Sequence, residues 1–269
     1  GSHTGKNSSR VVERPGHQWD KRRTGHRGYR GHHEGVAIDA DQATQQGRRQ
    51  IRSYVLRQGR MTQAQQHALD NYWPAMGIDF QPEPLDMARI FGNEHEIVIE
   101  VGFGNGESLL EQAARHPDQN FIGIEVHGPG VGHLMHLAHE AGISNLRVIR
   151  HDAVEVLAEQ IPAGSIHRLQ LFFPDPWHKK KHNKRRIVNP VFVELVRRAL
   201  VDGGLFHMAT DWQDYAEQML AQMESTEGFS NHFAAGEYAG HQGERSETRF
   251  ERRGRRLGHG VWDLIYEKS

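Results

Sequence analysis

The sequence has 269 residues, a hydrophobic fraction of 36% and a mean hydropathy of −0.72. This length suits one large α/β domain with appendages, and the low hydropathy indicates that part of the chain is solvated rather than packed in a core. The absence of cysteine excludes disulfides, thiolate metal ligands and a cysteine nucleophile. No apolar run approaches the roughly 18 residues that a membrane span needs. These features favour a cytoplasmic protein that binds no membrane.

The charge is unevenly distributed along the chain. Residues 1–35 hold eight basic residues against three acidic ones, which leaves 25 basic against 31 acidic residues, a formal charge of −6, for the remainder. Residues 1–50 are rich in Gly, Arg, His and Gln and have almost no apolar periodicity, and Gly1-Ser2-His3 resembles the remnant of an expression tag. We predict a flexible basic tail, which either binds RNA loosely or is dispensable.

The composition changes in residues 51–93, which we expect to form an appendage at the edge of the main domain. Thr62 and Gln65 have the spacing of a capping box, so a helix is expected to begin there. Trp73-Pro74 and the prolines of 82–84 are expected to interrupt it.

From residue 96 onward, apolar runs alternate with amphipathic segments. The expected strands are 97–101, 121–126, 146–150, 166–173, 205–209 and 261–266. The expected helices are 107–115, 130–141, 153–160, 186–200 and 211–223. This alternation predicts a parallel sheet with helices on both faces, within a single domain of residues 51–269.

A glycine-rich turn follows the first of these strands. Gly102, Gly104 and Gly106 allow the backbone to approach a ligand closely. The dinucleotide fingerprint G-x-G-x-x-G would need glycine at position 107, which is Glu107 here. Glu100, within the strand, is unfavourable to a pyrophosphate but suits a cationic ligand with an amino-acid end. S-adenosylmethionine carries a sulfonium and an ammonium, so it fits this turn better than NAD.

Two further acids end the next two strands. Glu125 lies where an acid accepts hydrogen bonds from ribose hydroxyls, and Asp152 is placed to contact the adenine amino group. The alternative is a tight strand–helix connection with solvated acids around it. Acids at the ends of three successive strands favour the cofactor site.

The most informative stretch is LQLFFPDPWHKKKHNKRR, residues 169–186. Asp175 lies between Pro174 and Pro176, which restrict its backbone, at the point where a buried strand emerges into solvent. The basic run that follows is expected to attract phosphates. Trp177 either stacks on a base or packs in the core. A rigid acid, an aromatic residue and a phosphate-binding run together indicate chemistry on a nucleic acid.

With the glycine turn, Glu125, Asp152 and FFPDPWHKKKHNKRR in place, the sequence resembles the bacterial tRNA (guanine-N7)-methyltransferase family, often called TrmB. The resemblance covers about residue 60 to the C-terminus and includes Thr248-Arg249-Phe250-Glu251, which matches the family's T-[KR]-F-E segment. It implies an α/β, Rossmann-like class I S-adenosylmethionine-dependent methyltransferase fold, whose mostly parallel sheet has an antiparallel last strand. It also implies methyl transfer from S-adenosylmethionine to N7 of a variable-loop guanosine in tRNA.

The resemblance further implies roles for individual residues. The residues implied to contact the methyl donor are Glu100, Glu125, Asp152 and Asp175, the last as the active-site acid. Those implied to contact the substrate are Lys179, Asp211, Thr248, Arg249, Phe250 and Glu251. Those implied to meet RNA are Lys181, His182, Asn183, Lys184, Arg185 and Arg186. The basic tail has no counterpart in the family's common pattern, so the resemblance implies no role for it.

The chemistry of guanine N7 bears on the role of Asp175. N7 has an in-plane lone pair and no proton at neutral pH, so methyl transfer needs alignment rather than deprotonation. We therefore expect Asp175 to position the base and stabilise its growing positive charge rather than to act as a general base. Asp211 could do the same from the other side, or could simply cap a helix. Glu251 could contact the substrate, or could pair with Arg252 or Arg255.

Other functions are compatible with parts of the sequence. Pro174-Asp175-Pro176-Trp177 is similar to the [DN]-P-P-[YF] motif of amino-group N-methyltransferases, although one acid between two prolines departs from it. An RNA-binding protein without catalysis is a second alternative, and a nicotinamide oxidoreductase is the weakest. His133, His136 and His139 share a helical face but lack a carboxylate that would complete a metal motif, so no metal is expected. The protein is expected to be a monomer or homodimer.

Overall fold

The computed structural model describes residues 52–55, 59–240, 245, 251 and 260–269. The predicted basic tail of residues 1–50 lies outside the described residues. The same holds for Thr248, Arg249 and Phe250 of the segment that is implied to contact the substrate.

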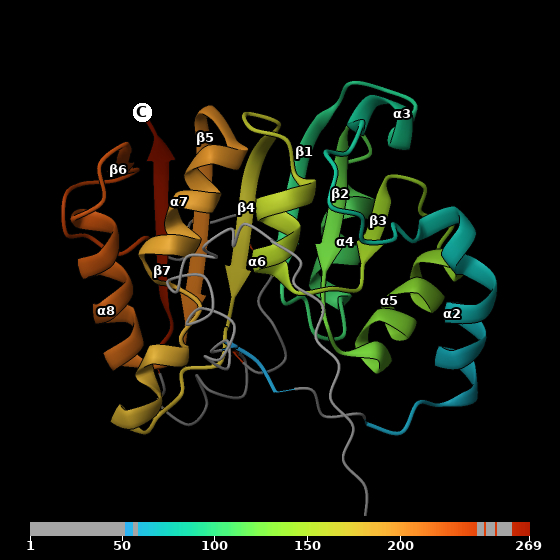
Figure 1. Ribbon diagram of the computed structural model, residues 1–269, viewed down its shortest axis with the longest axis horizontal. Coiled ribbons are helices and arrows are strands. Elements are labelled where there is room, and N and C mark those ends of the chain that lie inside the picture. The colour runs from blue at the N-terminus through green and yellow to red at the C-terminus, as the bar shows by residue number, and fades with distance from the viewer. Residues whose placement is uncertain (1–51, 56–58, 241–244, 246–250, 252–259) are drawn as a thin grey trace, which may run out of the picture. The chain divides into compact units, whose positions relative to one another are not determined.

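The described residues form one mostly parallel sheet (Figure 1). Its strands are β1 (Glu96–Val101), β2 (Gln119–Ile124), β3 (Leu146–Ile149), β4 (Ile166–Phe172), β5 (Leu200–Thr210), β6 (Phe229–Asn231) and β7 (Trp262–Lys268). They lie in the order β3-β2-β1-β4-β5-β7-β6. β1 to β5 pair in parallel, whereas β7 is antiparallel to both β5 and β6. The predicted fold class, with its antiparallel last strand, is confirmed.

Helices cover both faces of the sheet. They are α2 (Gln63–Met76), α3 (Met87–Phe91), α4 (Glu107–Arg115), α5 (Gly128–Glu140), α6 (Ala153–Glu155), the π-helical turn η1 (Val156–Gln160), the 3₁₀ helix η2 (Lys180–Arg185), α7 (Pro190–Ala199) and α8 (Gln213–Glu224). Buried residues of α2, α4 and α5 pack with Val98, Phe121 and Val148 in one cluster. Buried residues of η1, α7 and α8 pack in another cluster with Ile99, Leu169 and Phe206. Because side chains alternate along a strand, Glu100 shares the face of Val98.

The segment from α2 to α3 lies against the β3 edge of the sheet. The Ile78 amide donates to the Val148 carbonyl at 2.8 Å, and Gly77 forms an isolated parallel bridge with the same residue. α2 also packs on α5. A side-chain carbon at Gly132 would lie 2.6 Å from the backbone oxygen of Gln65, so this helix pair needs glycine at that position.

Several predicted boundaries are corrected by the structure. α2 continues past Pro74 to Met76, because a proline this close to the helix end removes only one of the last hydrogen bonds. α7 begins at Pro190 rather than residue 186, since the Asn189 side chain accepts from the Phe192 amide at 3.0 Å and caps the helix. β5 begins at Leu200, five residues earlier than expected. The sequence analysis did not predict α3 or β6, which have only five and three residues.

Candidate cofactor and substrate site

The predicted acids meet at one edge of the sheet. Parallel pairing places the carboxyl ends of β1, β2, β3 and β4 side by side. A cleft of about 390 Å³ opens at this edge and is lined by Gly102, Glu125, Asp152 and Asp175, among other residues. This volume lies in the range of small-molecule sites. Four separate predictions from the sequence therefore concern one cleft.

The glycine turn has two different reasons for its glycines. Gly102, Gly104 and Gly106 have φ values of 72°, 62° and 77°, a region that side chains disfavour. A side-chain carbon at Gly102 or Gly104 would meet nothing within 4 Å, so these residues expose backbone to open space. A side-chain carbon at Gly106 would lie 2.8 Å from the Leu134 side chain, so this glycine allows α4 to pack on α5.

Glu125 and Asp152 hold the backbone around the cleft. The Glu125 carboxylate accepts from the Gly104 amide at 3.0 Å and from the Val126 and His127 amides at 2.8 and 3.1 Å. Asp152 caps α6 by accepting from the Val154 amide at 2.8 Å. Both acids are therefore fixed in position before any ligand arrives, which is the preorganisation that binding favours.

Tyr54 also lines the cleft, although the sequence analysis did not identify it. Burial, the charge of Asp152 and a hydrogen bond with Asp152 raise the pKa of the Tyr54 hydroxyl. No local sequence pattern marks Tyr54 as a cleft residue, because about a hundred residues separate it from Asp152.

Glu100 differs from the other acids because it is buried, with only 4% of its surface exposed. Burial raises the pKa of its carboxyl to about 8; the guanidinium of Arg245 opposes this rise, and the charge of Glu125 adds to it. The carboxylate oxygen Oε2 has no hydrogen-bond partner among the described residues. An ammonium group would satisfy this oxygen and favour the ionised carboxylate. The buried acid therefore fits the amino-acid end of S-adenosylmethionine.

The turn that carries Asp175 has a strained backbone. Phe173 and Trp177 have φ values of 52° and 46°, which are uncommon for residues other than glycine. The Phe173 amide donates to the Ala209 carbonyl at 2.8 Å, and the Asp175 carboxylate accepts from the Trp177 amide at 2.9 Å. The surrounding structure holds this conformation, so the exposed Asp175 carboxylate has a defined place at the cleft.

Trp177 is half-buried, and its ring contacts neighbouring parts of the chain. Its indole nitrogen donates to the Ser53 carbonyl at 3.1 Å, and the Arg185 guanidinium lies 3.9 Å from the ring centroid. One face of the ring is therefore covered, which favours a structural role over stacking on a base. An exposed aromatic lies nearby instead: Trp212, 38% exposed, whose ring lies edge-on to His178 at 4.3 Å.

Asp211 follows β5 next to this turn and is exposed. The cap of α8 is Trp212, with no side-chain hydrogen bond, so Asp211 is not occupied as a helix cap. Lys179 is exposed at the start of η2.

The basic run is not uniform. Lys180, Lys181 and Lys184 are exposed on η2, whereas Arg185 donates to the carbonyls of Arg52 at 3.1 Å and Tyr54 at 3.4 Å. His182 and Asn183 are half-buried.

Arg186 differs from its neighbours in the basic run because its side chain is buried. Only 3% of its side chain is exposed, and it donates to Asp214 at 2.7 Å and to the Pro176 carbonyl at 2.8 Å. Its guanidinium also lies 4.7 Å from the centroid of the Tyr215 ring. These contacts give Arg186 a structural role, and its burial separates it from the exposed lysines of the same run.

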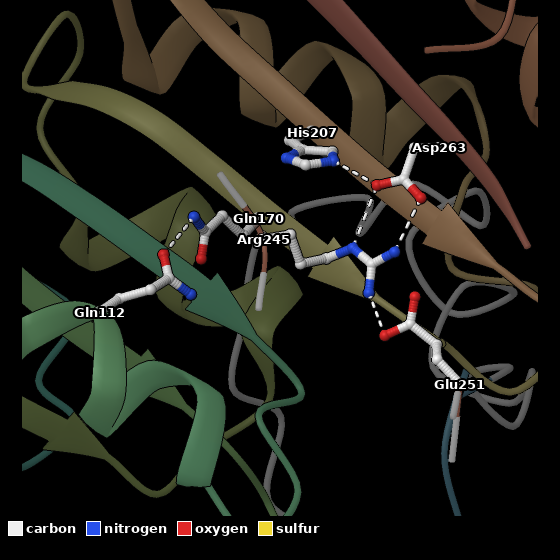
Figure 2. A network of polar contacts seen from close by, with 6 residues as sticks. All are labelled: Gln112, Gln170, His207, Arg245, Glu251 and Asp263. Atoms are coloured by element: carbon white, nitrogen blue, oxygen red, sulfur yellow. Dashed lines mark hydrogen bonds and ion pairs between the residues drawn. The ribbon is translucent and has the colours of Figure 1, made fainter. Parts of the chain in front are cut away.

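Glu251 is the described residue of the T-[KR]-F-E segment, and it is buried. Its carboxylate pairs with Arg245 at 2.5 Å (Figure 2). The alternative expected from the sequence was a pairing with Arg252 or Arg255 rather than with Arg245.

No cluster of three or more His, Asp or Glu that could hold a metal occurs in the part of the chain that the structure describes. Among the same residues, no helix has the length and apolar character needed to cross a membrane.

Comparison with known proteins agrees with this geometry. The family model described as "Putative methyltransferase" matches residues 94–264. The tRNA (guanine-N(7)-)-methyltransferase of Cronobacter sakazakii is 58% identical over 218 residues, which are 81% of this chain and 91% of that protein. The one from Serratia proteamaculans is 59% identical over 221 residues, 82% of this chain and 92% of that protein.

A solved structure gives the same fold at low sequence identity. The 16S rRNA methyltransferase KamB aligns over 70% of this chain and 95% of its own, with a TM-score of 0.51 and 16% identity. The fold, the glycine turn and the family match together define an S-adenosylmethionine-dependent methyltransferase with a Rossmann-like sheet. At the level of sequence, the chain belongs to the tRNA (guanine-N(7)-)-methyltransferase family. The predicted family and cofactor are thereby confirmed.

We expect Gly102→Ala to weaken S-adenosylmethionine binding by about tenfold or more, because the new methyl group enters the cleft that Gly102 lines and strains a backbone with positive φ. Gly92→Ala is the matched control: Gly92 has a φ of 72° and open space around it, but it ends α3 away from the cleft. Both variants should lose about 1 kcal/mol of stability. Calorimetric titration with S-adenosylmethionine should separate them, and equal affinities for the two variants would contradict this assignment.

Glu100 should make the stability of the ligand-free protein depend on pH. Its folded pKa of about 8 lies above the ordinary value of 4.5, so the folded state retains a proton that the unfolded state has released between these values. The free energy of unfolding should therefore fall as pH rises from 4.5 through 8, by on the order of a few kcal/mol. Glu100→Gln cannot ionise and should lack this component. Urea unfolding of both proteins at pH 5 and 8.5 measures it; an equal pH dependence would refute it.

Proposed function

We propose that this protein transfers the methyl group of S-adenosylmethionine to N7 of a variable-loop guanosine in tRNA, in the cytoplasm. The observation that carries the proposal is that Asp175 lines the same cleft as Glu125 and Asp152, at the carboxyl edge of the sheet. This arrangement can hold a nucleoside-containing cofactor beside an acid that faces a second substrate. The relatives from Cronobacter and Serratia bear names that specify tRNA and guanine N7.

The cofactor side of the cleft suits S-adenosylmethionine group by group. Glu100 would hold the ammonium, Glu125 the ribose hydroxyls and Asp152 the adenine amino group, while the backbone of Gly102 and Gly104 would lie against the ligand. S-adenosylmethionine, when bound, supplies an electrophilic methyl group on a sulfonium. The chain's task is then to orient the acceptor atom toward that methyl group and to exclude water.

Asp175 would act on the guanine rather than on the cofactor's methyl group. Guanine N7 has a free lone pair, so no proton has to leave before transfer. Methylation makes the purine cationic, and a carboxylate near N1–H and the exocyclic amine would orient the base and stabilise the charge. The strained turn between Phe173 and Trp177 supports this role, because it gives an exposed carboxylate a fixed direction.

The substrate side would be completed by residues around the same edge of the sheet. Among the described residues these are Lys179, Asp211 and Glu251, and the resemblance adds Thr248, Arg249 and Phe250, which lie outside the described residues. Asp211 is exposed and does not cap α8, which leaves its carboxylate able to contact a base. N7 of a stacked guanine is crowded in the narrow major groove of RNA, so the base must turn outward to reach this site.

The tRNA backbone would contact the run after Asp175. Lys181, Lys184 and the half-buried His182 and Asn183 would lie near phosphates, with Arg185 bonded to the carbonyls of Arg52 and Tyr54. We leave Arg186 out of the proposed set because its side chain is buried and paired with Asp214. The names of the relatives favour neither an amino-group methyltransferase nor a non-catalytic RNA-binding protein.

Asp175→Asn should lower the rate of methyl transfer to unmodified tRNA transcripts by about a hundredfold, because the amide keeps the shape but not the charge. Its affinity for S-adenosylmethionine should change much less than the rate. Asp118→Asn, an exposed acid before β2, serves as the control and should leave the rate unchanged. Incorporation of labelled methyl groups at saturating tRNA measures the rate, and an unimpaired Asp175→Asn variant would exclude the proposed role.

Substitutions of two basic residues in the same run should affect different properties of the protein. Lys184→Ala should weaken tRNA binding and reduce the slope of log affinity against log salt by about one, without changing stability. Arg186→Ala should instead lower the free energy of unfolding by about 2 kcal/mol, since it removes charged hydrogen bonds from a buried side chain. Filter binding at several salt concentrations and urea unfolding distinguish them. A loss of stability in Lys184→Ala with none in Arg186→Ala would reverse the assignment.

A further inference from the structure

A row of buried polar side chains crosses one face of the sheet. Glu100 on β1 lies in register with Gln170 on β4, which in turn lies in register with His207 on β5. All three are buried, so each needs polar partners. Gln170 finds one in Gln112 of α4, to which its amide donates at 2.8 Å.

The row continues into the last strand. His207 Nε2 lies 2.7 Å from Asp263 on β7. Burial lowers the pKa of His207, although Asp263 opposes that shift. Since a carboxylate only accepts, the neutral imidazole donates from Nε2. Burial works against the charge of Asp263, but its hydrogen bonds with His207 and Arg245 lower the pKa of the carboxyl below its usual value.

Arg245 ends the row and holds three parts of the chain together. Its guanidinium donates to both oxygens of Asp263, at 3.0 and 2.8 Å, and its third nitrogen pairs with Glu251 (Figure 2). Its central carbon lies 5.5 and 5.3 Å from the ring centroids of Phe172 and Phe173. Only 6% of the side chain is exposed.

These contacts connect two functional segments that are far apart in the sequence. Glu251 belongs to the T-[KR]-F-E segment, and Phe173 is the strained residue that begins the turn of Asp175. Both pack on one guanidinium, which β7 fixes through Asp263. The planar fork of arginine suits three such partners, whereas the ammonium of lysine cannot reproduce the geometry.

We propose that Arg245 is a positioning residue for methyl transfer, which holds Glu251 and the Phe173–Asp175 turn in the arrangement that receives the guanosine. This inference rests on the proposed function. On this inference, Glu251 supports the substrate side through its pair with Arg245, and not only by contacting the substrate. Small displacements of a catalytic group cost large factors in rate, so loss of the fork should act on the chemical step.

Arg245→Lys is the direct test, because it keeps a cation near Glu100 while removing the fork. The single-turnover rate of methyl transfer at saturating tRNA should fall by about tenfold or more. The affinity for S-adenosylmethionine should stay within about threefold of the wild type, since the cleft glycines and acids are unchanged. Arg197→Lys is the matched control, because Arg197 makes a comparable two-pronged pair with Glu194 on the exposed surface of α7.

If Arg245→Lys fails to fold, Glu251→Gln still tests the inference, because in this variant Arg245 keeps its pair with Asp263. Glu251→Gln should lower the transfer rate. The double variant that combines Arg245→Lys with Glu251→Gln should be no slower than the slower single variant, as expected of residues that act as a unit. Multiplying effects would show that Glu251 acts independently of Arg245 and would overturn the inference. So would a parallel loss of cofactor affinity and rate, which is the mark of general damage.

The wild-type protein separates the two proposals. If it transfers methyl groups to tRNA and Arg245→Lys matches it in rate, the inference is wrong and the proposed function stands. If the wild type itself transfers nothing to tRNA, the proposed function is wrong, and the inference that rests on it is overturned as well.

Discussion

The parallel pairing of β1 to β4 is the constraint on which the site depends. It places four carboxyl ends at one edge, so that Glu100, Glu125, Asp152 and the turn of Asp175 meet although they span 76 residues of the chain. The sheet buries Glu100, which raises the pKa of its carboxyl, whereas Asp175 stays exposed. One edge of one sheet thus offers a buried acid suited to a cation and an exposed acid suited to a base.

The antiparallel end of the sheet has a different part. β7 brings Asp263 beside β5, and Asp263 fixes Arg245, which in turn contacts Glu251 and Phe173. A buried cation with two carboxylate partners is costly to disturb, because removing one partner leaves a charge without compensation. The strained turn is held from this side by the guanidinium and from β5 by the Ala209 carbonyl. The turn of Asp175 is therefore held by contacts from both the parallel and the antiparallel part of the sheet.

Much of the fold could be predicted from local patterns, because apolar runs and caps such as Thr62 act over a few residues. The acids of the cleft could also be predicted, since each directly follows a recognisable strand. Properties set by distant partners could not. Arg186 looks like its neighbours in the basic run until Asp214 and Tyr215 bury it, and Arg245 looks like any arginine of a charged segment. The positive φ of Phe173 is equally invisible, because no glycine marks it.

The most direct measurement is to map the methyl group that the wild-type protein transfers from S-adenosylmethionine to unmodified tRNA transcripts. N7-methylguanosine permits strand scission, so the modified position can be read from the cleavage pattern. The proposed function predicts a cut at a single variable-loop guanosine. Methylation of an exocyclic amino group, or cofactor binding without transfer to any tRNA, would contradict it.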